Sequence, residues 1–101
     1  MRFLVKATVP IKAGNKSIKE GTLSTTIRKA MDELKPEAAY FFEEDGHRTS
    51  LFVLNLEKAS DIPRTVEPFF LGVNAEVRLH PVMTAEDLAA AGLDDVAKKW
   101  G

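Results

Sequence analysis

The chain has 101 residues, of which 45% are hydrophobic and 29% charged, and this composition is typical of one globular domain spanning residues 1–101. A formal net charge of -1 disfavours nucleic acid and anionic membranes as partners. The chain contains no cysteine, which excludes disulfides, thiolate metal sites and a cysteine nucleophile.

The first segment, residues 2–9, alternates its side chains with a period of two, which predicts a strand that ends at Pro10. Lys6 interrupts the apolar residues of this segment, and such an interruption is not typical of an export signal. No window approaches the roughly 20 apolar residues that a membrane span needs. We therefore expect a soluble protein of the cytoplasm.

A long helix is predicted next, beginning at a cap formed by Asn15 or Ser17 and ending before Pro36. Gly21 weakens it by about 1 kcal/mol relative to alanine, so a break is expected there if the helix has one. Apolar residues spaced by three and four form the stripe expected to face the core: Ile18, Leu23, Ile27, Ala30, Met31 and Leu34.

Residues 37–44 contain a run of aromatic side chains and predict a short strand. Asp45 and Gly46 follow, and this dipeptide favours a tight turn between antiparallel strands. Residues 49–56 are the predicted returning strand. Its residues 51–54 are apolar on both faces, which favours a central position in the sheet.

A second helix is predicted to begin at a cap formed by Ser60 or Asp61 and to end at Gly72. Pro68 lies within it and is expected to kink the helix or to end its regular part, because proline has no amide hydrogen. The stripe expected to face the core is Ile62, Val66, Phe69 and Phe70.

The last predicted strand, residues 74–83, alternates charged and apolar side chains and then stops. Glu76, Arg78 and His80 share one face of this strand, while apolar residues occupy the other. A short helical tail follows. It begins at a capping Thr84, is interrupted at Gly92, and continues over residues 93–100.

The order strand, helix, strand, strand, helix, strand predicts an α+β protein of the ferredoxin-like type, βαββαβ. Right-handed crossovers place both helices on one face of a four-stranded antiparallel sheet with order 4-1-3-2. The other face then exposes apolar side chains over several hundred Å², which is uncommon on monomers. We therefore expect a homodimer with sheet-to-sheet packing about a two-fold axis.

The whole chain resembles the dimeric α+β barrel superfamily, and three segments, residues 35–41, 46–49 and 80–84, resemble a bacterial subfamily of small proteins without an established activity. The superfamily includes muconolactone isomerases and antibiotic-biosynthesis monooxygenases, whose pockets lie between the sheet and helices of each subunit. The resemblance implies a dimeric ferredoxin-like subunit with a pocket in that place. It carries over no catalytic residue.

His80 is a candidate general base, since histidine titrates near neutral pH and a carboxylate beside it would orient it. The structural alternative is a histidine hydrogen-bonded at a dimer seam. Glu76 is expected to pair across strands with Lys6 or Arg2, because such pairs set strand register.

Arg78 and Lys6 are candidates to hold a carboxylate ligand, with ion pairing between strands as the structural alternative. Tyr40 offers a ring and a hydroxyl, although aromatic residues at strand spacing also form core or dimer packing. Apolar residues near the kink at Pro68 would line a cleft between helix and sheet, with Trp100 beside them. The candidate pocket residues are His80, Arg78, Tyr40, Lys6, Phe69 and Phe70.

Several other kinds of site are not expected. Two separated histidines do not form a zinc site, no glycine-rich phosphate loop is present, and no serine stands in a nucleophile elbow. We expect no metal and no cofactor. Two functions remain: a small-molecule-binding protein or cofactor-independent enzyme with an apolar pocket for a small apolar molecule or aromatic acid, and a non-catalytic regulatory or interaction module whose sheet face serves only dimerisation.

Overall fold

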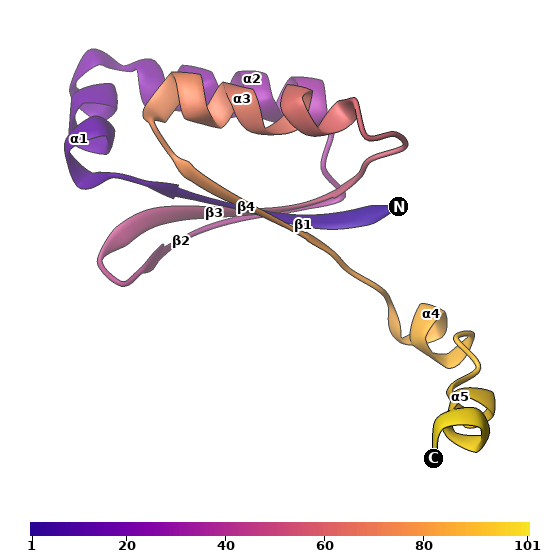
Figure 1. Ribbon diagram of the computed structural model, residues 1–101. Helices are drawn as coiled ribbons and strands as arrows, with labels where there is room; N and C mark the ends of the chain where they lie inside the picture. The colour runs from indigo at the N-terminus through magenta and orange to yellow at the C-terminus, as the bar shows by residue number, and fades with distance from the viewer.

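The computed structural model describes all 101 residues and contains four strands and five helices. Figure 1 shows two parts, a sheet with helices on one side and a C-terminal segment that extends away from them. The elements in chain order are β1 (Arg2–Val9), α1 (Ile11–Glu20), α2 (Thr22–Leu34), β2 (Ala38–Glu44), β3 (His47–Asn55), α3 (Asp61–Val73), β4 (Glu76–Pro81), α4 (Ala85–Ala89) and α5 (Leu93–Trp100).

The four strands form one antiparallel sheet with the order β2-β3-β1-β4. Read from the β4 edge, this is the order 4-1-3-2 that the sequence predicted, so the sheet is confirmed. Helices α1, α2 and α3 lie on one face, and the other face is left without a covering element (Figure 1). We call this uncovered side the open face.

The core lies between the sheet and α2 and α3. Val5 of β1 and Phe52 of β3 are paired neighbours and are both fully buried. Phe52 stacks on Phe69 of α3 with ring centroids 5.3 Å apart, and it meets the edge of Phe41 at 5.9 Å. Period-two alternation thus sends one set of strand residues into the core and leaves the other set on the open face.

The first helical region is split at Gly21, whose φ of 74° suits glycine, and the predicted break is confirmed. The predicted start at Asn15 or Ser17 is wrong, because α1 begins at Ile11 directly after Pro10. The hydroxyl of Ser17 donates to the carbonyl of Ala13 and so cannot act as a cap. Ile18, expected in the core, is exposed because the break rotates α1 relative to α2.

Helix α3 runs through Pro68 without ending there and stops at Val73. Its buried side chains are Thr65, Val66, Phe69 and Val73. Ile62 and Phe70, which the sequence assigned to the inner stripe, are partly exposed. The inner stripe follows the spacing 66, 69, 73, and Phe70 lies about 100° around the helix from Phe69.

The turn between β2 and β3 is confirmed, because Asp45 and Gly46 both have positive φ, 53° and 79°. Strand β3 begins two residues earlier than predicted, directly after this turn. Strand β4 is shorter than predicted, since Asn74 adopts a left-handed conformation that ends α3.

The C-terminal segment, residues 82–101, is called the arm. Thr84 caps the first helix of the arm, α4, with a capping box. The Thr84 hydroxyl accepts a hydrogen bond from the Asp87 amide at 3.1 Å, and the Thr84 amide donates one to the Asp87 carboxylate at 2.9 Å. The radius of gyration is 16.9 Å, against about 13 Å for a compact chain of this length. None of the helices combines the length and apolar character that a membrane crossing requires.

The capping box gives a testable titration. Hydrogen bonds from the Thr84 amide and hydroxyl hold the pKa of Asp87 below its ordinary value of 3.8. A lowered pKa in the folded state means that the cap stabilises α4 fully above pH 3.8 and loses this effect as the pH falls through the folded pKa. We expect Thr84→Ala to move the Asp87 pKa part of the way back, because the amide donor remains.

A pH titration of the Asp87 carboxyl carbon by NMR measures this shift. Thr25→Ala, in α2, is the control and should leave the titration unchanged. An Asp87 pKa that is identical with and without the Thr84 hydroxyl contradicts the prediction.

Candidate functional site

The open face of the sheet brings together most of the residues that the sequence singled out. Residues paired directly across antiparallel strands point to the same side of a sheet. The strand register therefore arranges the open face in cross-strand rows. From β2 to β4, three of these rows are Ala38, Val53, Leu4 and His80; Tyr40, Leu51, Lys6 and Arg78; and Phe42, Thr49, Thr8 and Glu76.

These rows divide the open face into an apolar part and a polar edge. On this face the side chains of β4 in these rows are charged or titratable, those of β2 and β3 are mainly apolar, and β1 contributes Leu4 beside Lys6 and Thr8. Tyr40 is 61% exposed and Phe42 is 41% exposed. We call the apolar part the apolar floor, and it comprises Leu4, Tyr40, Phe42, Leu51 and Val53.

Two of the three cations on this face, Arg2 and Lys6, form ion pairs, and the third, Arg78, does not. Arg2 pairs with Glu37 at the end of the sheet, and Lys6 pairs with Glu44 of β2. The hydrogen bond with Glu37, followed by its charge, raises the pKa of Arg2. Arg78 has no carboxylate within 4.0 Å. The guanidinium of Arg78 is therefore the one cation of the open face that is free to bind an anion.

Glu76 does not make the pairs that the sequence suggested. Lys6 binds Glu44 and Arg2 binds Glu37, so neither is available to Glu76. Carboxylates at the opposite edge of the sheet, Glu37 just before β2 and Glu44 within it, take the place of Glu76. The predicted cross-strand pairs of Glu76 are wrong.

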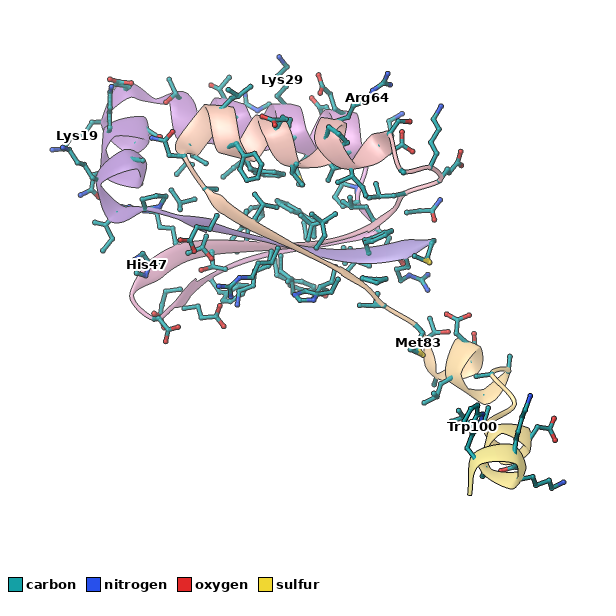
Figure 2. The ribbon with its side chains drawn as sticks, in the orientation of Figure 1. Lys19, Lys29, His47, Arg64, Met83 and Trp100 are labelled. Atoms are coloured by element: carbon teal, nitrogen blue, oxygen red, sulfur yellow. The ribbon has the colours of Figure 1, made fainter.

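A polar hollow of about 390 Å³ lies at the end of the open face near the β2–β3 turn. His47, at the start of β3, marks this end of the sheet in Figure 2. The hollow contains cations and carboxylates in similar number, and its lining residues are Lys6, Thr8, Pro10, Glu44, Asp45, His47, Glu76 and Arg78. Two predicted residues, Lys6 and Arg78, thus belong both to the central row and to this hollow.

His80 lies beside Leu4 on the open face and one row away from Arg78. Glu76 is four residues from it on the same strand, a separation of about 13 Å. No side-chain hydrogen bond or ion pair orients the His80 ring. The carboxylate that a general base at His80 requires is therefore not supplied by Glu76.

The two candidate residues of α3 lie on the other side of the sheet. Phe69 is buried and fills the space between α3 and the sheet, where it stacks on Phe52. Phe70 is 40% exposed, and Trp100 lies far off on the arm (Figure 2). The structure thus groups Tyr40 with the β1 and β4 candidates and separates the phenylalanines from them.

A groove beside Pro68 does exist, but it lies between α2 and α3 on the outer surface. It has a volume of about 590 Å³. Lys29 and Arg64 stand at its rim and project from the helical layer in Figure 2. The sequence had placed a cleft at Pro68 between the helix and the sheet, so the position of that cleft is corrected.

Several residues of the open face were not identified from the sequence as site residues. Leu4 and Leu51 were recognised as apolar strand residues without a role in a site. Glu44 was not considered, because its contact with Lys6 depends on the register of β1 against β3. The sequence feature that could have identified them is the apolar character of residues 51–54 on both faces of their strand, which indicated that both faces would be covered.

Comparisons with known proteins assign no family to the chain. No family model matches the sequence, and no curated protein matches it. Among solved structures, the de novo designed protein Ferredog-Diesel is similar, with a TM-score of 0.48, 8% identity, and coverage of 80% of this chain and 85% of that one. This likeness is too low to carry an argument. No group of three or more histidine, aspartate or glutamate side chains is placed to hold a metal ion.

Proposed function

We propose that the protein is a homodimer whose two sheets pack through their open faces and which binds a small aromatic acid between them. The strand and helix order and the sheet order support a ferredoxin-like subunit, and face-to-face packing would make it a member of the dimeric α+β barrel type. The proposed pocket lies on the open face, because Phe69 fills the space on the helical side.

Dimerisation is supported by the exposed apolar floor. Tyr40 and Phe42 together offer roughly 200 Å² of exposed aromatic surface, using 150–250 Å² for a whole aromatic side chain. Leu4, Leu51 and Val53 extend this surface across β3 and β1. Two such sheets pack about 10 Å apart and exclude water from both floors. This packing is favourable because it removes apolar surface from water.

The single observation that carries the ligand proposal is the unpaired guanidinium of Arg78 in one row with Leu51 and Tyr40. Arginine binds a carboxylate through two parallel hydrogen bonds. A planar apolar ring attached to that carboxylate would lie over the floor. Apolar walls with a few convergent polar groups are typical of small-molecule sites.

Binding, rather than a reaction, is the function that this geometry supports best. His80 lies one row from Arg78, but no carboxylate orients its ring. A cofactor-independent reaction would need His80 to gain such a partner from the ligand or from the second subunit. We therefore assign His80 to the edge of the pocket.

The second candidate function is a non-catalytic interaction module whose sheet face serves only dimerisation. One observation favours it, namely that the polar hollow is neutralised in part by its own Lys6–Glu44 pair. In this case Arg78 would be satisfied by a carboxylate of the partner subunit. Binding of an aromatic acid by the wild-type protein distinguishes the two functions.

The test is a thermal shift with benzoate, phenylacetate and salicylate, each against wild type and Arg78→Gln. A ligand that binds only the folded state raises the melting temperature, and above its dissociation constant the stabilisation grows with the logarithm of the ligand concentration. We expect Arg78→Gln to weaken binding by about 10-fold or more, because a hydrogen bond to a charged group contributes about 1.5–3 kcal/mol. A ligand series without any shift in wild type would favour the interaction module.

The matched control is Arg64→Gln. Arg64 lies on the outer surface of α3, at the groove between α2 and α3. Its replacement by glutamine removes the same charge far from the open face. Binding should be unchanged in this variant. Equal losses in the two variants would show a non-specific effect of charge and would overturn the role of Arg78.

A further inference from the structure

The two helices of the arm are not packed against the rest of the molecule. Neither α4 nor α5 contains a buried residue, and Trp100 at its tip is 81% exposed. Figure 1 shows the arm leaving the end of β4 and running away from the helical layer, on the side of the sheet that the helices leave uncovered. An ordinary compact domain of this size does not hold two helices away from its core.

The arm is nevertheless built to be helical. The capping box at Thr84 begins α4, and α5 has acids in its first turn and lysines in its last turn, as the helix dipole favours. Isolated helices shorter than about 12 residues are marginal in water. Helices of 5 and 8 residues therefore need a surface to pack against.

One side of the arm is suited to such a surface. Leu93, Val96 and Trp100 are spaced by three and four residues and form a single stripe along α5. Leu88 extends the apolar surface onto α4, and Met83 extends it to the base of the arm. All five of these side chains are exposed.

The base of the arm is held in place. The amide of Val82 donates to the carbonyl of Arg2 at 3.1 Å and so continues the pairing of β4 with β1. The arm therefore starts in line with β4 and is directed away from its own floor.

We propose that the arm packs on a second copy of the chain and covers the part of the partner's open face that sheet packing leaves uncovered. This proposal rests on the face-to-face dimer proposed above and adds that each binding site is incomplete without the partner's arm. The two-fold symmetry of a homodimer places both arms in equivalent positions.

The surface areas agree with a second copy as the occupant. Tyr40, Phe42 and Trp100 expose roughly 400 Å² of aromatic surface together. Stable interfaces bury about 800 Å² on each partner. The aliphatic side chains of the stripe and the floor supply much of the remainder, whereas the floor alone falls short. The arm is thus the element that brings the interface to an ordinary size.

Trp100 is the only tryptophan of the chain and reports directly on the arm. We expect its emission in the dimer to be blue-shifted and protected from iodide, and to become red-shifted and quenchable on dilution to monomer. Sedimentation equilibrium on the same samples gives the oligomeric state. The variant Leu93→Ser with Val96→Ser should raise the dimer dissociation constant by 10-fold or more and expose Trp100.

The control is Asp95→Ser with Lys98→Ser, on the polar side of α5, which keeps the net charge and should leave both measurements unchanged. A dimer with Trp100 fully accessible to iodide would overturn the arm proposal and leave the sheet packing intact. A monomer with Trp100 buried at every concentration would show that the arm packs on its own subunit. A monomer with Trp100 exposed at every concentration would overturn the arm and the proposed dimer together.

Discussion

Replacing Leu51 by glutamate is expected to dissociate the dimer, raising its dissociation constant by at least about 100-fold. Leu51 lies in the central row of the open face, between Tyr40 and Lys6. In the proposed dimer a carboxylate at this position would be removed from water, and each buried charge costs several kcal/mol. The two-fold axis places two such charges in one interface, and 100-fold corresponds to about 2.7 kcal/mol.

Sedimentation equilibrium measures this change, and circular dichroism checks that the monomer remains folded. Leu71→Glu is the matched control, because Leu71 is 81% exposed on α3 and faces away from the sheet. The same change of residue there should leave the dissociation constant unchanged. A dimer that survives Leu51→Glu would mean that the sheet face is not the interface.

The sequence was sufficient to predict the order of the sheet, because some strand boundaries carry a strong local signal. Pro10 ends β1, and the Asp45–Gly46 turn fixes the register of β2 against β3. Antiparallel pairing and right-handed crossovers then leave few topologies for the remaining strands. The order β2-β3-β1-β4 follows from these rules.

The faces of the helices were harder to predict, because helical periodicity defines a stripe but not its exact rotation. Phe70 is next to Phe69, and either aromatic ring fits a stripe drawn from the sequence. The stacking of Phe69 on Phe52 decides between them, and this contact joins residues that are far apart in the chain. Ile18 was misplaced for a related reason, since the break at Gly21 gives α1 an orientation that one continuous helix would not have.

The candidate site was only partly predictable for a similar reason. The alternation within β4 identified Arg78 and His80 as neighbours on one face. Their position beside Lys6 and Leu4 depends on how β4 is aligned with β1, and no tight turn links these two strands. The Lys6–Glu44 pair was missed because it depends on how β1 is aligned with β3, the strand that lies between these two residues.

Truncating Phe52 to alanine is expected to lower the free energy of unfolding by about 3–5 kcal/mol. Phe52 is fully buried at the centre of β3 and contacts aromatic rings from two directions, Phe69 at 5.3 Å and Phe41 at 5.9 Å. Its removal leaves a cavity between the sheet and α3 that the paired strands cannot collapse to fill. Domains of this size have total stabilities of about 5–15 kcal/mol, so the loss is a large fraction of the whole.

Urea unfolding at a fixed protein concentration measures this loss, since dimer stability depends on concentration. Phe70→Ala is the control, because its ring is partly exposed one residue further along α3, and we expect a smaller loss of about 1–2 kcal/mol. Phe52→Leu keeps most of the buried volume, so its loss in free energy of unfolding should fall between the other two. This variant still tests the prediction if Phe52→Ala does not fold. Equal losses at Phe52 and Phe70 would mean that α3 is rotated relative to the sheet, and the space between them would then be open to a ligand.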